Sequence, residues 1–254
     1  MEDDDLEEKE IGTIGKSYKI FKKIGKGATS KVFKVKPEGK EIGKFYAAKV
    51  FKNLPFRKKN DFENEKAILS VLNENEIKSP YILNLIDSGR DEIRRIDRKT
   101  SANNYLVVDY MKNGCLFDFI YYPEVGLDED LSKLLFYKIF TAIKICQDSH
   151  ICIRDIKLDN ILLDDNYNPV LCDFGFGVIS ENEITGIDGT KNYLAPEVYS
   201  KKPYNGFPVD IFNLGIALLI LITGKTNICT LKIDRTARLL FKKDYDSFWK
   251  KFES

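Results

Sequence analysis

The sequence predicts an α+β fold with two lobes, a strand-rich N-terminal lobe and a mainly helical C-terminal lobe. Up to Tyr110, short runs rich in Val, Ile, Phe and Tyr alternate with Gly and Pro, a pattern typical of strands. After Asn113-Gly114, apolar residues recur every three or four positions, as on the buried face of a helix. The 254 residues suffice for one large domain or for two lobes around a cleft.

The N-terminal lobe is predicted to begin with three strands, at residues 18–24, 31–36 and 45–51. A helix over residues 59–72 is expected next, because several apolar side chains are available to one of its faces. These side chains are Phe62, Ala67, Leu69 and Leu72.

Two further strands are expected at residues 81–88 and 105–110, where apolar residues again form short runs. The polar stretch 90–104 between them is expected to be an exposed loop. Residues 111–114 would form the hinge, so we expect the N-terminal lobe to span residues 16–111.

The C-terminal lobe, residues 112–254, is expected to be helical. One buried helical face is predicted from the spacing of Leu131, Leu134, Leu135, Ile139, Ile143 and Cys146. The apolar run 214–223 is shorter than the roughly 20 residues that span a bilayer, so we expect a buried helix there. Residues 243–250 predict a short amphipathic helix.

Composition argues against several classes of protein. The 40 Lys and Arg balance 39 Asp and Glu, so the net charge gives no argument for binding to nucleic acid or membrane. The five Cys lack CxxC spacing, which favours a reduced, cytoplasmic protein over a disulfide or metal framework. The start, MEDDDLEEKE, is unlike a signal or transit peptide, and we expect residues 1–15 to be a disordered acidic tail.

The most informative stretch is residues 153–175, which holds side chains that phosphoryl transfer uses. Asp155 and Asn160 lie on one predicted loop, and Asp173 follows the short apolar strand 170–172. Phosphoryl transfer needs metal-held phosphates and an aligned hydroxyl more than covalent chemistry. A carboxylate near the hydroxyl, with Asp and Asn oxygens for magnesium, supplies those parts.

A second candidate for phosphate binding lies between the first two predicted strands. Residues 24–32, IGKGATSKV, hold two glycines that let backbone amides approach phosphates closely. Alone this pattern is weak, since any Gly-rich hairpin looks similar. Lys49 follows in an otherwise apolar strand, where an ordinary surface lysine is the plain alternative.

Taken in order, these motifs resemble the catalytic core of eukaryotic protein kinases. The Ser/Thr class is indicated because Lys157 lies two residues after Asp155. The resemblance covers about residues 18–224. It implies a bilobal protein-kinase fold that transfers the γ-phosphate of Mg-ATP to Ser or Thr hydroxyls of protein substrates.

The resemblance implies a role for each polar residue of the 153–175 stretch. Asp155 would position the substrate hydroxyl, and Lys157 would steady the transferred phosphate. Asn160 and Asp173 would each hold magnesium.

Two later residues would support this loop. Thr190, which precedes Ala195-Pro196-Glu197, would tie its own segment to Asp155 and Lys157. Asp210 would hydrogen-bond the loop backbone, and an ordinary helix N-cap is the compatible alternative.

The resemblance also implies an ATP site. Lys49 would hold the α- and β-phosphates and needs a carboxylate partner from the next helix, where Glu65 fits best and Glu63 is the alternative. Val32 and Ala47 would cap the adenine. The complete implied ATP-binding set is Ile24, Gly25, Lys26, Gly27, Ala28, Thr29, Ser30, Val32, Ala47, Lys49, Glu65, Val108, Asp109, Met111, Leu162 and Asp173.

Three of these implied contacts lie around the hinge. Val108 would lie behind the adenine, and the backbone from Asp109 to Met111 would contact its edge.

Three positions depart from the family's pattern. Ser30 stands where a third Gly is usual, and Ile153 stands where His or Tyr usually packs. Cys115 replaces a Glu that in many kinases favours basic substrates. Asp159 would still attract a basic residue near the phosphoacceptor.

Arg154 precedes Asp155, as in kinases that are switched by phosphorylation of the following segment. Ser180 and Thr185 are candidate acceptors, and our hypothesis is that Thr185 is the regulatory site. Three acidic residues of the same segment are alternatives that would pair with Arg154 without phosphorylation: Glu181, Glu183 and Asp188.

Beyond residue 224 the resemblance ends. A kinase domain carries further helices, one with an arginine that pairs with Glu197, and Arg235 and Arg238 come too early in the order for that role. We therefore expect an incomplete C-terminal lobe. Three alternatives follow: an active Ser/Thr kinase, an ATP-binding pseudokinase or scaffold, and a fragment that folds only with a partner chain.

Overall fold

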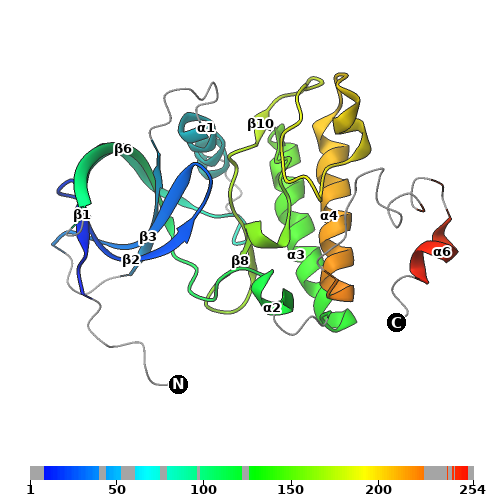
Figure 1. The fold of residues 1–254 in the computed structure, drawn as a ribbon, viewed down its shortest axis with the longest axis horizontal. Coiled ribbons are helices and arrows are strands. Elements are labelled where there is room, and N and C mark those ends of the chain that lie inside the picture. Colours follow the sequence, from blue (N-terminus) through cyan, green and yellow to red (C-terminus); the bar gives the residue numbers. More distant parts are fainter. Residues whose placement is uncertain are drawn as a thin grey trace. The chain divides into compact units, whose positions relative to one another are not determined.

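The computed structural model describes residues 9–39, 44–52, 61–74, 79–95, 98–121, 126–225, 239, 242 and 244–250. The chain divides into two compact units (Figure 1). The first comprises Met1–Asn73 with Leu83–Met111, and the second comprises Glu74–Ile82 with Lys112–Ser254. The predicted α+β architecture is confirmed, because the first unit is rich in strands and the second contains the long helices α3 and α4.

Six strands of the first unit form a closed barrel in the order β1–β2–β3–β4–β6–β5, with antiparallel pairing throughout. Their bounds are Gly12–Ile14 (β1), Tyr18–Lys26 (β2), Ser30–Pro37 (β3), Tyr46–Phe51 (β4), Leu85–Arg95 (β5) and Arg98–Asp109 (β6). The three strands predicted at the start of the N-terminal lobe are therefore confirmed as β2, β3 and β4.

Strand β1 corrects the expectation of a disordered tail over residues 1–15, although the first eight of these lie outside the described part of the chain. β1 pairs with β2 on one side and with β5 on the other, so that Thr13 lies opposite both Lys19 and Arg94. Ile14 is fully buried in the barrel core and anchors the strand. The sequence gives little sign of this strand, because β1 is only three residues long and follows a long acidic run.

The exposed loop expected at residues 90–104 is also wrong, and the strand expected from residue 81 begins only at Leu85. β5 and β6 continue through the polar stretch as one long hairpin, with Ile93 opposite Ser101. Ile93 is 6% exposed and packs in the barrel core, whereas its charged neighbour Glu92 is exposed. A polar stretch such as this one gives too little alternation to reveal a strand, and pairing between strands stabilises it instead.

The barrel encloses the core of the first unit, which the inward-facing side chains of its strands fill. In β3, Phe33 and Val35 point into this core while the lysines between and after them point outward. The rings of Tyr18 and Tyr105 meet edge to face at 6.4 Å.

Helix α1 (Asp61–Glu74) follows β4 and corresponds to the helix predicted over residues 59–72, whose first two residues are outside the described chain. Its buried residues are Phe62, Glu65, Ile68, Leu69 and Leu72. Ala67, expected on the apolar face, is exposed because it lies off this stripe of residues three and four apart. The Phe62 ring meets the Phe51 ring of β4 at 5.5 Å, so the buried face of α1 lies toward that strand.

The second unit is built around two long helices, α3 (Glu129–Asp148) and α4 (Gly206–Thr223), which pack against each other (Figure 1). Two small antiparallel sheets, β7–β10 and β8–β9, accompany them. The other elements are α2 (Asp118–Tyr121), β7 (Ile151–Cys152), η1 (Leu158–Asn160), β8 (Ile161–Leu163), β9 (Pro169–Leu171), β10 (Val178–Ile179), η2 (Pro196–Ser200) and α6 (Tyr245–Trp249). The short helix predicted at residues 243–250 is confirmed as α6.

The predicted buried face of α3 is correct in its later turns and wrong in its first. Leu135, Ile139, Ile143 and Cys146 are buried, while Leu131 and Leu134 are 44% and 51% exposed. Adjacent helical residues differ by about 100° in direction, so Leu134 and Leu135 cannot face the same neighbour equally.

Helix α4 extends the apolar run expected at residues 214–223. Its 18 residues are long and apolar enough to cross a membrane by length and composition, and half of them are buried. It begins at Gly206, with the Asn205 side chain accepting from the Phe207 N–H at 3.0 Å, so the alternative of Asp210 as its N-cap is wrong. Asp210 and Asn213 are fully buried and hydrogen-bonded to loop backbone, which fits a helix in a protein core.

Candidate active site

The loop from Ile153 to Asn160, between β7 and β8, is fixed by helix α4. The two carboxylate oxygens of Asp210 accept the backbone N–H groups of Ile153 at 2.8 Å and Arg154 at 2.7 Å. Burial raises the pKa of Asp210 to about 7, while these two N–H groups and Arg154 oppose the shift. The expected contact between Asp210 and the loop backbone is confirmed.

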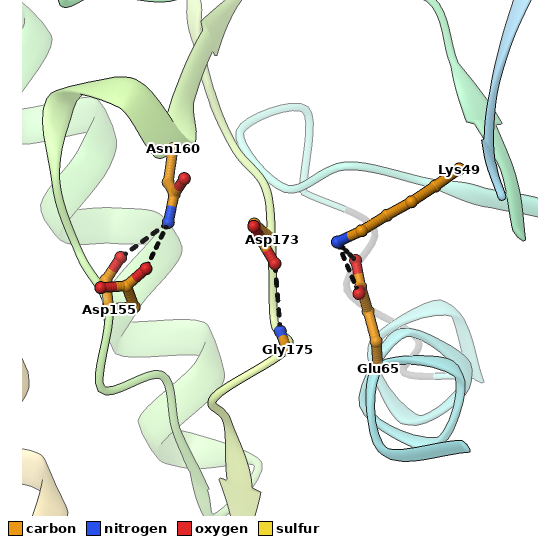
Figure 2. Close-up of polar contacts among 6 residues, drawn as sticks. All are labelled: Lys49, Glu65, Asp155, Asn160, Asp173 and Gly175. Carbon is orange, nitrogen blue, oxygen red and sulfur yellow. Dashed lines mark hydrogen bonds and ion pairs between the residues drawn. The ribbon is translucent and has the colours of Figure 1, made fainter. Parts of the chain in front are cut away.

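Asp155 lies at the centre of this loop and is 2% exposed. Its Oδ2 accepts from Asn160 Nδ2 at 3.0 Å (Figure 2). The same oxygen lies 3.0 Å from Lys157 Nζ. Asn160 Nδ2 also donates to the Asp155 carbonyl at 2.9 Å. Asp155 Oδ1 is buried without a hydrogen-bond partner in the described part of the chain. The loop thus holds one oxygen of the carboxylate and leaves the other as an acceptor.

Lys157 joins this loop to the segment that precedes η2. Its Nζ donates to Thr190 Oγ1 at 2.7 Å and lies beside Asp155, so the three residues form one connected group. The expected tie of Thr190 to this loop is confirmed.

Asp173 lies just beyond β9, which pairs with β8 so that Ile161 is opposite Leu171. The Cys172 N–H donates to the Asn160 carbonyl at 2.9 Å, which brings the segment that follows β9 to the 153–160 loop. Asp173 has a φ of 62°, and its Oδ1 accepts the Gly175 N–H at 3.2 Å (Figure 2). A positive φ is unusual for a residue other than Gly and is often found at functional sites.

Asn160 and Asp173 fit a magnesium ion by the chemistry of their donor atoms. The amide nitrogen of Asn160 is used on Asp155, so its amide oxygen is the atom left for a cation. Magnesium at ATP sites binds one or two carboxylates together with substrate phosphates, and Asp173 supplies one. Among the described residues, no group of three or more His, Cys, Asp or Glu forms a metal site.

In the first unit, Lys49 of β4 pairs with Glu65 of α1 (Figure 2). Lys49 Nζ lies 2.8 Å from Glu65 Oε1 and 2.7 Å from Oε2, and the two side chains are 16% and 5% exposed. Glu65 is on the buried stripe of α1, whereas Glu63 is exposed. The choice of Glu65 over Glu63 as the partner of Lys49 is confirmed.

Replacing Glu65 by Gln is expected to destabilise the protein by on the order of 3 kcal/mol, because it removes the buried carboxylate that pairs with the Lys49 ammonium. Urea unfolding followed by fluorescence measures this change. Glu63→Gln, on the exposed side of the same helix, is the matched control and should shift the free energy of unfolding by less than about 0.5 kcal/mol. Equal effects of the two substitutions would contradict the pairing.

The Gly-rich turn between β2 and β3 has a defined shape. The Gly27 N–H donates to the Ser30 carbonyl at 3.0 Å. Lys52 Nζ donates to the carbonyls of Gly27 and Ala28, at 2.8 and 2.7 Å. The backbone N–H of Lys52 donates to the Thr29 carbonyl at 2.7 Å. Because the Gly27 N–H is used within the turn, the other backbone amides of the turn are the ones that would meet an anion.

Three residues expected around the adenine, Val32, Ala47 and Val108, share one face of the barrel wall with Lys49, which was expected at the phosphates. Val32 lies opposite Lys49, and Ala47 lies opposite Val108. Since side chains alternate along a strand, Ala47 and Lys49 point the same way, and their cross-strand neighbours share that face. The opposite face carries core residues such as Ala48.

The hinge residues and Leu162 lie in different units. Asp109 ends β6, where its N–H donates to the Asn84 carbonyl at 3.4 Å and its carboxylate accepts from Lys44 at 2.7 Å. Met111 ends the first unit. Leu162 lies in β8 of the second unit, bridged to Cys115.

The candidate regulatory residue Arg154 makes an ion pair with a carboxylate of the 176–190 segment. Arg154 is 3% exposed, and its Nη2 lies 3.1 Å from Asp188 Oδ2. Thr185 is exposed. Glu181 lies 3.4 Å from His150 instead. Of the acidic alternatives weighed for Arg154, Asp188 is the one that makes the ion pair.

Two supporting residues escaped sequence reasoning. Asn213 Nδ2 donates to the Tyr193 carbonyl at 2.8 Å, and the Tyr204 hydroxyl donates to the Gly186 carbonyl at 3.0 Å. An apolar helix and a polar loop give no local pattern that reveals such contacts. Arg235 and Arg238, which come too early in the order to be the arginine that pairs with Glu197, lie outside the described chain.

Comparison with known proteins gives the same family over most of the chain. The family described as protein kinase domain matches residues 18–252. CBL-interacting protein kinase 11 of Oryza sativa subsp. japonica is 29% identical over 82% of this chain and 39% of its own length. The probable serine/threonine-protein kinase MARK-B of Dictyostelium discoideum is 32% identical over 82% of this chain and 27% of its own. The cell cycle serine/threonine-protein kinase CDC5/MSD2 of Saccharomyces cerevisiae is 31% identical over 85% and 29%.

The chain spans less than half of the length of these curated relatives. The similarity nevertheless includes both the strand-rich first unit and the loop that carries Asp155, Lys157 and Asn160. Because the family model matches more than half of the residues of this chain, the chain belongs to the protein kinase family.

Proposed function

We propose that this chain is a protein serine/threonine kinase that transfers the γ-phosphate of Mg-ATP to Ser or Thr hydroxyls of protein substrates. The observation that carries the proposal is Asp155 Oδ1, a buried acceptor without a partner among the described residues. Buried polar atoms are nearly always hydrogen-bonded, and leaving one unsatisfied costs about 1–3 kcal/mol. A substrate hydroxyl that donates to Oδ1 removes this cost and is aligned by doing so.

In the proposed reaction, the substrate hydroxyl oxygen forms a bond to the γ-phosphorus as the bond from that phosphorus to ADP breaks. The hydroxyl proton goes to Asp155. Lys157, held between Asp155 and Thr190, places a positive charge next to the oxygens of the transferred group.

The ATP phosphates are the proposed ligands of Lys49, which Glu65 orients, and of the backbone amides in the turn between β2 and β3. Asn160 and Asp173 are the proposed magnesium ligands. Magnesium, when bound with ATP, neutralises charge on the phosphates.

Substrates with basic residues near the phosphoacceptor suit the acidic surroundings of Cys115. Burial raises the pKa of Cys115 to about 11, and Asp118, whose carboxylate accepts its thiol at 3.2 Å, and Asp159 add to this shift. These two carboxylates stand near the position where the family's usual Glu is absent. We also propose a cytoplasmic location, for which the free thiols of Cys115, Cys146 and Cys152 give support.

The proposal is tested with the purified chain, Mg-ATP and a basic Ser/Thr peptide. Asp173→Asn is expected to reduce transfer by about 10²-fold or more and to raise the magnesium concentration needed for half-maximal rate, because a carboxylate ligand is lost. Radiolabel transfer across a magnesium titration measures both effects. Asp148→Asn, an exposed residue of α3, is the control and should leave the titration unchanged.

A pseudokinase would behave differently in the same experiment. ATP would raise its melting temperature, by a stabilisation of about 2.7 kcal/mol at a concentration of 100 times Kd, with no phosphate transferred. That result would replace the enzyme proposal with a nucleotide-binding scaffold.

A further inference from the structure

We propose that Asp188 is a positioning residue whose carboxylate neutralises the buried guanidinium of Arg154 and thereby holds the 153–160 loop, so that no phosphate on the 176–190 segment is required. The proposal rests on the proposed kinase function for its activity readout only. Its structural readout is independent of catalysis.

The first step concerns the charge of Arg154. Its guanidinium stays protonated in proteins, and here it is 3% exposed, so it needs a counter-charge. Its Nε donates to the Phe176 carbonyl at 2.8 Å, and its Nη2 pairs with Asp188 Oδ2 at 3.1 Å. Asp210 also lies near enough to interact with Arg154, but both of its oxygens accept backbone N–H groups. Asp188 is therefore the carboxylate that meets the guanidinium directly.

The second step concerns the backbone that carries Asp188. Gly186 and Gly189 flank it with φ of 104° and 115°, in the region that favours glycine. A Cβ at Gly189 would lie 2.5 Å from the Arg154 carbonyl oxygen, so the backbone passes closely over Arg154 at this point. The Tyr204 hydroxyl donates to the Gly186 carbonyl at 3.0 Å from the other side. These contacts place Asp188 over Arg154 by main-chain geometry.

The third step connects this pair to catalysis. Arg154 immediately precedes Asp155, and one residue beyond Gly189 the hydroxyl of Thr190 accepts from Lys157. Loss of the Asp188 charge would remove the carboxylate that pairs directly with the buried guanidinium of Arg154, and it would loosen the segment that presents Thr190. Asp155 and Lys157 would then be less well placed.

The fourth step concerns phosphorylation. Thr185 is exposed, and the guanidinium of Arg154 already binds Asp188 and the Phe176 carbonyl. Arg154 Nη1 also lies 3.5 Å from the Tyr204 hydroxyl, so a phosphate on Thr185 would have to compete with these existing contacts for the guanidinium. In this proposal the Asp188 carboxylate, which needs no modification, takes the role that the earlier hypothesis gave to a phosphate on Thr185.

The experiment compares Asp188→Asn, Asp188→Glu and the control Glu183→Gln, an exposed acid of the same segment. The full chain is treated with phosphatase, and intact mass confirms that it carries no phosphate. We expect the dephosphorylated wild type to keep its activity. Asp188→Asn should lower kcat about tenfold or more with the ATP-induced thermal shift retained, and Asp188→Glu should recover part of the loss.

Hydrogen–deuterium exchange gives the readout that does not need activity. Amides of residues 186–190 should exchange faster in Asp188→Asn than in Glu183→Gln, even if the chain transfers no phosphate. Loss of activity on dephosphorylation, with its return on phosphorylation of Thr185, would overturn the proposal. Equal exchange in Asp188→Asn and Glu183→Gln would overturn it as well. If Asp188→Asn does not fold, the comparison is made between Asp188→Glu and the wild type, where faster exchange supports the role and unchanged exchange with unchanged kcat contradicts it.

Discussion

Asp155→Asn is expected to lower kcat by about 10²–10⁴-fold, since it removes the group proposed to accept the hydroxyl proton. The substitution keeps the size of the side chain and one acceptor oxygen, so the fold and the contact with Asn160 should survive. Steady-state transfer of labelled phosphate to a peptide gives kcat, and thermal shift with Mg-ATP gives nucleotide binding. Binding should be nearly unchanged, because the proposed phosphate contacts of Lys49 are untouched.

The control for this variant is Asp165→Asn, an exposed aspartate in the turn between β8 and β9. It removes one negative charge from the same unit without touching the 153–160 loop. Activity in Asp155→Asn equal to that of Asp165→Asn would show that Asp155 is not the base. A parallel loss of nucleotide binding would instead point to a general disruption of the loop.

Asp210→Ala is expected to destabilise the protein by on the order of 3–5 kcal/mol, because two backbone N–H groups lose their charged acceptor in a fully buried site. That is a large part of the roughly 5–15 kcal/mol that stabilises a typical domain. Urea unfolding at several temperatures measures the change. Kinase activity should fall with it, since the same N–H groups belong to the two residues before Asp155.

Two further variants make this prediction specific. Asp210→Asn keeps one acceptor oxygen and should lose less stability than Asp210→Ala. Asp148→Ala, at an exposed site paired with Lys144 on α3, should change the free energy of unfolding by less than about 0.5 kcal/mol. A loss in Asp210→Ala no larger than that of Asp148→Ala would show that the loop does not depend on α4.

The parts of the site that the sequence predicted are those with local order. Lys49 and Glu65 were predicted from the resemblance to protein kinases, Lys49 as a lysine within an otherwise apolar strand and Glu65 as the better-fitting carboxylate on the helix that follows. Asp155, Asn160 and Asp173 were recognisable because their spacing carries the chemistry. None of these predictions needed knowledge of how distant segments meet.

What escaped prediction depends on contacts between distant segments. The sequence alone does not distinguish Asp188 from Glu181 and Glu183 as the partner of Arg154. The backbone turn at Gly186 and Gly189 places Asp188 against it. The same reason explains why Asp210 lies in the second turn of α4 instead of capping it. Local propensity cannot distinguish a carboxylate that caps its own helix from one that holds a loop 56 or 57 residues away.

The β5–β6 hairpin shows the same limit in the fold. Ile93 is a buried apolar side chain in a polar stretch, and its burial follows from the neighbouring strands β1 and β6. Leu131 and Leu134 show the reverse case. Their spacing suits a buried face, yet α3 buries a stripe rotated away from them.

Closure of the barrel by β1 has a consequence for self-association. A ring of strands has no free edge, whereas an open sheet presents unpaired N–H and C=O groups on which another chain can add a strand. Here the three residues of β1, Gly12–Ile14, close the ring, because β1 pairs with both β2 and β5. A version of the protein that starts after Ile14 would carry two exposed edges, and the choice of first residue thus decides whether the barrel is protected from edge-to-edge aggregation.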